Sequence, residues 1–290
     1  MSTVDPLYVA ARKILLDALE ALAPHSDAVV IAGAQAIYLR AGQGDLAVAP
    51  YTTDGDLALD PRRLTERPAL EQTMGEAGFC LQLMAGGHVE PGIWLKSALV
   101  EGRPVSVPVD LIVPQAAAPA GGRRGVRLGP HGKQAARRAV GLEAALVGNS
   151  VMTIAALDPT DTRSVQAKVA GTAALLVAKL HKLHDRVDHG REDRLHDKDA
   201  ADVIRLMQAT APTEMAATLA MLAKDDLAGP STLDAIGYLE NLFGRRGRPG
   251  IDMAAEALRI AMPKDRVSAL CVAYTEAVLA SLDEFSQKRI

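Results

Sequence analysis

The sequence is poor in cysteine and in aromatic residues, and both shortages narrow the kinds of protein that we expect. Two cysteines occur in 290 residues, Cys80 and Cys271, and they lie too far apart to form a short metal-binding or redox motif. We therefore expect no disulfide-stabilised scaffold and favour a reducing compartment. Aromatic residues make up 3% of the chain, so aliphatic side chains must fill most of its core.

Long apolar runs and a large net charge are also missing. No stretch approaches the roughly 18 apolar residues that span a bilayer, and residues 1–13 lack the apolar centre of a signal peptide. We therefore expect a cytoplasmic protein that does not bind membranes. The formal net charge of −3 predicts no general attraction to nucleic acid, so any such affinity must come from a local basic patch.

The chain is long enough for two domains, and a turn-rich break near residues 157–162 divides two patterns. We predict an α/β (α+β) domain over residues 1–158, with a mixed β-sheet flanked by helices, and an all-helical bundle over residues 159–290. In the first part, helices are expected near 7–22 and 68–77, and strands near 28–31, 54–59, 79–83, 89–96 and 105–113. In the second, helices are expected near 165–187, 195–207, 212–223, 231–243, 251–260 and 264–282.

Two aspartates, Asp54 and Asp56, stand at the start of the strand predicted near 54–59, where Leu57 and Leu59 alternate with Asp56 and Ala58. Residues two apart in a strand share a face, so both carboxylates would project together. Neighbouring carboxylates repel each other unless a cation lies between them. Mg²⁺ or Mn²⁺ would suit such oxygen ligands. Taken alone, the stretch is more typical of a solvated turn.

Two further positions suggest phosphate or metal chemistry. Gly33 and Ala34 follow the apolar strand near 28–31 and open a helix, whose first backbone N–H groups could bind a phosphate. Tight packing would explain a single glycine there as well. Asp110 lies between apolar neighbours in a predicted strand. If it is buried it needs a partner or a metal; otherwise it would lie on an exposed edge strand beside Pro108.

A basic segment covers residues 123–138. No acidic residue occurs between Leu111 and Leu142, whereas six basic ones gather there. The segment is a candidate surface for phosphates, a nucleotide or RNA. The alternative is a solvated loop balanced by acids elsewhere, and no aromatic residues are interleaved to stack on bases. The six residues are Arg123, Arg124, Arg127, Lys133, Arg137 and Arg138.

The helical half carries charged residues at regular spacing. Lys179 and Arg186 lie seven residues apart and would project from one side of a helix. Asp199 and Asp202 lie three apart on one face of the next helix. The plainest interpretation is a salt bridge between the two helices that uses Arg186 or Lys182.

The order of these motifs resembles the minimal nucleotidyltransferase, or polymerase-β-like, superfamily, with its turn at Gly33, its paired Asp54 and Asp56, and its third aspartate at Asp110. The Lys179-(six residues)-Arg186 and Asp199-x-x-Asp202 motifs are similar to those of the AbiEii-like branch. Members of that branch are toxins of type IV abortive-infection and toxin–antitoxin systems. The resemblance covers roughly residues 28–206.

The resemblance implies transfer of a nucleotide from an NTP to a macromolecular hydroxyl, in characterised members the acceptor end of tRNA, by two-metal phosphoryl transfer. An antitoxin protein is an implied partner. The sequence departs from the family at Ala34, where Gly or Ser is usual, and at Pro50, where Arg is usual. The implied catalytic residues are Asp54, Asp56, Asp110 and Lys179, the three aspartates also being the metal ligands. The implied nucleotide-binding residues are Gly33, Ala34, Lys179, Arg186, Asp199 and Asp202.

Two other functions stay open. His184-Asp185, with His181, His189 and His196 nearby, is also typical of metal-dependent phosphohydrolases of the His-Asp type. The second alternative is a protein of the nucleotidyltransferase fold that binds nucleotide or RNA without turnover. The departures at Ala34 and Pro50 favour this alternative. For the transferase, we expect replacement of Asp56 or Lys179 by alanine to abolish transfer and to leave the fold intact.

Overall fold

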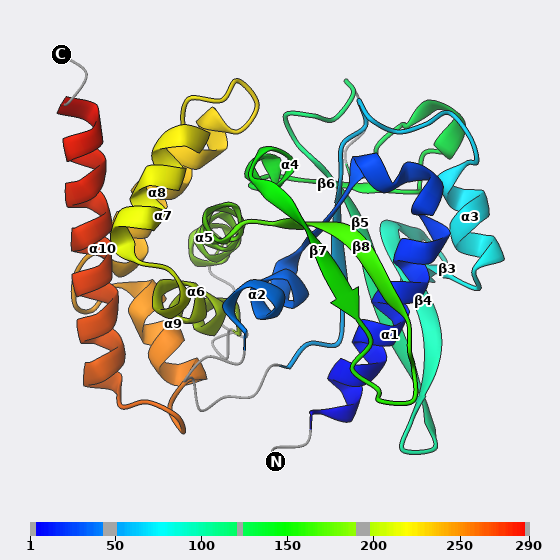
Figure 1. Ribbon diagram of the computed structural model, residues 1–290, viewed down its shortest axis with the longest axis horizontal. Coiled ribbons are helices and arrows are strands. Elements are labelled where there is room, and N and C mark those ends of the chain that lie inside the picture. Colours follow the sequence, from blue (N-terminus) through cyan, green and yellow to red (C-terminus); the bar gives the residue numbers. More distant parts are fainter. Residues whose placement is uncertain (1–3, 43–50, 121–123, 190–197, 288–290) are drawn as a thin grey trace.

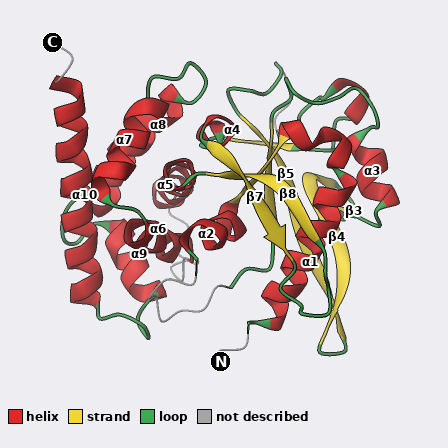
Figure 2. Ribbon diagram, viewed as in Figure 1, coloured by secondary structure: helices red, strands yellow, loops and turns green. Residues whose placement is uncertain are grey.

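The computed structural model describes residues 4–42, 51–120, 124–189 and 198–287. Pro50, Arg123 and His196, which the sequence analysis weighs, lie outside these ranges. The described residues form a mixed sheet flanked by helices, followed by a helical region, which confirms the predicted fold class. Figure 2 shows the strands together on one side of the molecule and most of the helices on the other.

The described residues form an eight-stranded sheet in the order β3-β4-β5-β2-β1-β8-β7, with β6 paired to β5. Strand β2 runs parallel to β5 and antiparallel to β1, and β1 runs parallel to β8. The central strand β1 is apolar and buried along its whole length, as a strand covered on both faces requires. The strands are β1 (Val29–Ala32), β2 (Gly55–Leu59), β3 (Cys80–Leu83), β4 (Val89–Val100), β5 (Arg103–Pro114), β6 (Arg137–Ala139), β7 (Asn149–Ala155) and β8 (Ser164–Ala170).

Helix α1 (Pro6–Ala21) lies across the sheet, against β4, β5 and β8 (Figure 1). Its N-cap residue is Asp5, whose carboxylate accepts hydrogen bonds from the first backbone N–H groups of the helix. Helix α2 (Gly33–Ala41) follows β1 directly and lies between the sheet and the helical region. It contacts β1, β2, α5 (Thr172–Asp188) and α6 (Lys198–Ala209). Helix α2 is therefore shared by the two parts of the molecule.

The helical region is arranged around α5, which packs against α2, α4, α6 and α8 (Figure 1). Helix α10 lies on the outer side, against α7 and α9. The buried apolar side chains form one continuous core from α1 and the sheet to α10. Among the described helices, none is both long enough and apolar enough to cross a membrane. The remaining helices are α3 (Leu70–Glu76), α4 (Glu143–Val147), α5 (Thr172–Asp188), α6 (Lys198–Ala209), α7 (Pro212–Leu222), α8 (Gly229–Phe243), α9 (Pro249–Ala257) and α10 (Lys264–Gln287).

The helix predicted over 165–187 is wrong at its start. Residues 164–170 form strand β8, paired with β1 and β7, and α5 begins only at Thr172. The segment alternates Val165, Ala167 and Val169 with polar residues, which is a strand period, although Val169 also fits the helical stripe. The sheet thus extends beyond residue 158, and the division into two domains there stays a prediction. Strands β6 and β7 and helix α4 were not predicted either.

The turn between β1 and α2 depends on Gly33. Its φ of 64° lies in the left-handed region that glycine adopts without strain. A Cβ atom at this position would overlap the carboxylate of Asp56, which lies against the turn because Ala32 and Asp56 are register partners in β1 and β2. The absence of a side chain at Gly33 is therefore what lets Asp56 occupy this place.

Replacement of Gly33 should cost more than replacement of Gly42, which gives a matched control. Gly42 has a nearly equal φ of 62°, but a Cβ there would meet nothing within 4 Å. We expect Gly33→Ala to lower the free energy of unfolding by about 1–3 kcal/mol more than Gly42→Ala, since only Gly33→Ala forces a half-buried side chain to move. Urea denaturation of both variants measures this, and equal losses would mean that Asp56 does not lie against Gly33.

Candidate functional site

The sheet brings the predicted carboxylates to one place. Asp56 in β2 and Asp110 in β5 are direct register partners on parallel neighbouring strands, so their side chains lie on the same face. Asp54 precedes β2 by one residue. Burial raises the pKa of Asp56 to about 6, and the charges of Asp54 and Asp110 add to the rise. Asp56 makes no side-chain hydrogen bond or ion pair with the described residues.

Asp110 is paired with an arginine. Arg137 in β6 donates two hydrogen bonds to its Oδ2, from Nη2 at 2.6 Å and from Nε at 3.2 Å. The alternative of an exposed edge strand is wrong, because β5 lies between β4 and β2. Burial raises the pKa of Asp110 in spite of this partner. Sequence reasoning placed Arg137 with the RNA-binding candidates and missed its pairing, which depends on β6 lying beside β5.

The backbone at Asp54 is held by a buried hydrogen-bonded chain. Gln35 in α2 donates to the carbonyl oxygen of Asp54 at 2.9 Å and accepts a bond of 2.8 Å from Nε of Arg12. Both side chains are buried. Thr52 donates a further bond to Oδ1 of Asp54. These residues were not predicted, although a polar Gln35 in the otherwise apolar start of α2 could have indicated one of them.

A second charged group joins α5 to α6. The ammonium of Lys179 contacts Asp199 and lies 2.8 Å from Oδ2 of Asp202, and all three side chains are buried. Asp199 Oδ2 also lies 2.9 Å from Lys182 and 2.8 Å from Arg186. Burial alone would lower the pKa of Lys179, but attraction to the two carboxylates outweighs it and raises the pKa.

The predicted set Lys179, Arg186, Asp199 and Asp202 therefore comes together, in the arrangement that the salt-bridge interpretation expects. Burial by itself would raise the pKa of Asp199, but attraction to Lys179 and Lys182 lowers it well below the usual range. The predicted contact of Lys179 with a phosphate stays a prediction, because its ammonium is engaged by two carboxylates here.

A ready-made metal cluster is not present in the described parts of the chain, where no three acidic, histidine or cysteine side chains converge to hold an ion. The histidines weighed for a phosphohydrolase have other partners. His184 stacks on Tyr238, with ring centroids 3.8 Å apart, and His181 contacts the same ring edge-on. His189 bonds a backbone carbonyl of its own helix at 2.7 Å. This arrangement does not favour the phosphohydrolase.

The basic segment is partly neutralised. Arg137 is paired with Asp110, and Arg124 lies 3.2 Å from Glu90. Arg127 and Lys133 are exposed and have no ion pair with the described residues. The surface charge that this segment could offer to RNA is therefore smaller than the sequence suggests.

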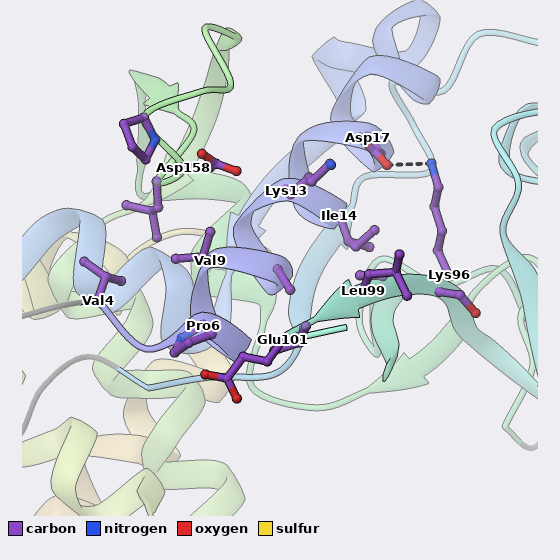
Figure 3. A pocket seen from close by; sticks show the side chains of 16 residues that line it. Val4, Pro6, Val9, Lys13, Ile14, Asp17, Lys96, Leu99, Glu101 and Asp158 are labelled. Carbon is purple, nitrogen blue, oxygen red and sulfur yellow. Dashed lines mark hydrogen bonds and ion pairs between the residues drawn. The ribbon is translucent and has the colours of Figure 1, made fainter. Parts of the chain in front are cut away.

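A pocket of about 710 Å³ lies elsewhere, between α1, β4 and residues 157–159. Its wall is largely apolar, and the ion pair between Lys96 and Asp17 lies at one end (Figure 3). No predicted site residue lines it. The predicted carboxylates thus lie outside this cavity.

Comparison with known proteins gives distant likenesses. No family model matches the chain, and no curated protein matches it. Among solved structures, JHP933 from Helicobacter pylori is similar at 13% identity with a TM-score of 0.44, covering 98% of this chain and 97% of that one. A protein of H. pylori provisionally named a nucleotidyltransferase is similar at 11% identity with a TM-score of 0.37, over 95% and 96% of the two chains. Likenesses this distant do not bear on the function of this chain.

The stability of the metal-free protein should fall with rising pH because of Asp56. The unfolded chain loses this proton near the ordinary pKa of 3.8, whereas the native state keeps it to about pH 6. Stability is therefore lost as the pH rises between these values, by at most about 3 kcal/mol. We expect Asp56→Asn to be more stable than the wild type at pH 8 in EDTA and no more stable below pH 4. Denaturant titrations across this range measure it, and a difference that does not change with pH would contradict the assignment.

Lys179 should matter more for stability than Lys182, although both contact Asp199. The Lys179 side chain is 6% exposed and that of Lys182 is 51% exposed. Removing a partner from a buried ion pair typically costs about 3–5 kcal/mol, whereas an exposed pair contributes less than about 1 kcal/mol. We expect Lys179→Met to lose the larger amount and Lys182→Met the smaller.

Urea denaturation of both lysine variants checks this, and equal losses would contradict it. The expected loss differs from the sequence-based expectation that Lys179 can be replaced with the fold intact. The reason is burial: the change leaves two carboxylates, Asp199 and Asp202, without their shared cation.

Proposed function

We propose that this protein transfers a nucleotide from an NTP to a macromolecular hydroxyl, with Mg²⁺ or Mn²⁺ held at Asp54 and Asp56. One observation carries the proposal. The charges of Asp54 and Asp110 act on the carboxylate of Asp56, which lies against the start of α2 and has no side-chain hydrogen bond or ion pair with a described residue. A place with unbalanced negative charge suits a hard divalent cation.

The donor set fits such an ion. Mg²⁺ in proteins is commonly bound through one or two carboxylates together with phosphate oxygens and water. Asp54 and Asp56 supply the carboxylates, in keeping with the lack of a three-residue metal group among the described residues. Asp110 is proposed to join them through Oδ1 only after its side chain shifts, since Arg137 engages Oδ2 and the three carboxylates do not converge among the described residues. When bound, the ion would activate the acceptor hydroxyl and neutralise charge on the phosphates, including the pyrophosphate that leaves as the nucleotide is transferred.

The turn at Gly33 would receive phosphate oxygens. No side chain caps the start of α2, so the first backbone N–H groups of the helix remain available to an anion. Ala34 offers no hydroxyl there, which leaves the contact to the backbone. Gln35 and Arg12 hold the backbone of Asp54 beside this turn, so the carboxylates and the helix start keep a fixed relation to each other.

The acceptor and the cellular role are proposed from the motif resemblance. We propose an RNA acceptor, the acceptor end of tRNA in the first place, with Arg127 and Lys133 as exposed contacts to its phosphates. The same resemblance supports a toxin that is neutralised by an antitoxin protein. Co-expression with neighbouring genes would identify such a partner.

The direct test is incubation of the purified chain with each labelled NTP, Mg²⁺ and total tRNA. We expect label in RNA, none in EDTA, and a loss of at least about 100-fold for Asp56→Ala, because several kcal/mol of charge stabilisation depend on the bound ion. Asp226→Ala, which removes an exposed aspartate outside the site, is the matched control and should transfer at the wild-type rate.

Other outcomes of this assay separate the alternatives. Wild-type transfer by Asp56→Ala would overturn the site. Bound but unchanged NTP would indicate a binding module without turnover, and phosphate release without transfer would indicate a phosphohydrolase. Label on the protein itself would indicate self-modification in place of an RNA acceptor.

A further inference from the structure

Two lysines one turn apart on α5 have very different surroundings. The side chain of Lys179 is 6% exposed, and its ammonium is engaged by Asp199 and Asp202. The side chain of Lys182 is 51% exposed, and the described residues give it one ion pair, at 2.9 Å from Asp199. An ammonium has three donors, so Lys182 has both the room and the donors to bind an anion.

A second exposed lysine faces the carboxylates from α6. The Nζ of Lys198 lies 3.8 Å from Oδ1 of Asp54, at the outer limit of an ion pair, and its side chain is 45% exposed. Lys198 directly precedes Asp199, the residue that pairs with Lys182. The start of α6 therefore carries one lysine at Asp54 and, through Asp199, positions the other.

The charge of Lys182 also reaches the carboxylates. Burial raises the pKa of both Asp56 and Asp110, and Lys182 is among the charges that oppose the rise at both residues. Lys179 opposes it at Asp56 too, but less than Lys182 does. Lys182 is thus exposed and close enough to the proposed metal ligands for its charge to act on them. Lys179 is buried and paired with two aspartates.

We propose that Lys182 and Lys198 bind phosphate oxygens of the nucleoside triphosphate, and that Lys179 is a positioning residue that holds α5 against α6. The inference rests on the proposed function. A triphosphate bound to Mg²⁺ keeps a net negative charge, so the ion would face Asp54 and Asp56 while the remaining charge faces the two lysines. To bind a phosphate, each lysine would have to give up at most one ion pair with a carboxylate. Both lysine side chains are solvent-accessible.

The experiment is equilibrium binding of ATP, GTP, CTP and UTP, each with Mg²⁺, to the full chain. We expect Lys182→Gln and Lys198→Gln each to weaken binding of the preferred NTP by about 10- to 100-fold, the range for one charge-assisted hydrogen bond. The affinity for the corresponding nucleoside, which lacks phosphates, should stay unchanged. The fall in the unfolding midpoint should be no larger than the small loss expected for Lys182→Met. Lys182→Arg should restore most of the affinity, because it keeps the charge.

Lys224→Gln is the matched control, since Lys224 is an exposed lysine that follows α7 and lies outside the site. It should bind NTP as the wild type does. Wild-type affinity in both Lys182→Gln and Lys198→Gln would overturn the inference and leave the proposed function standing. If the wild type binds none of the four NTPs, the proposed function falls, and the inference falls with it.

Discussion

The structure is organised around an electrostatic conflict at the ends of β2 and β5. Asp56 lies beside Asp110 on the next strand and close to Asp54, in a place where burial already disfavours charge. Several features keep the conflict in place. Because Gly33 has no side chain, Asp56 fits against α2. Gln35 donates a hydrogen bond that holds the backbone of Asp54. None of these contacts supplies a positive charge to Asp56, and the charges of Lys182 and Lys179 offset the repulsion only in part. The proposed cation would complete the balance.

The charges between α5 and α6 form the opposite case. Lys179 balances Asp199 and Asp202 within the protein, and the three side chains are buried together. A buried ion pair of this kind is weak support for stability in itself, but it is costly to break, so it fixes how two elements meet. The contrast separates two uses of charge in one molecule. One set is compensated within the protein, and the other is only partly offset at Asp56, where the proposed ion would bind.

Features that depend on residues close together in the chain, such as single strands, could be predicted from the sequence. The period-two alternation after Asp54 and Asp56 predicted their strand, and the apolar run around Asp110 predicted another. Features that depend on strand order could not be predicted. That Asp56 and Asp110 are register partners follows from β2 lying beside β5, and the partner of Asp110 follows from the placement of β6. The sequence also could not show that Lys179 is buried whereas Lys182 is exposed, because the two lysines lie one turn apart on the same helix. Strand β8 was missed because Val169 fits both a strand period and a helical one.

Helix α2 has a consequence for how this protein can be divided. Its first turn meets the carboxylates, while its flank packs on α5 and α6, and Ala34, Gln35, Ala36 and Ile37 are buried between the two parts. A fragment ending at Ala170 would keep every described strand and all three aspartates. It would, however, expose to solvent the side of α2 that packs on α5 and α6. The part that carries the sheet and the three aspartates should therefore not be obtainable as a stable, separate domain by truncation.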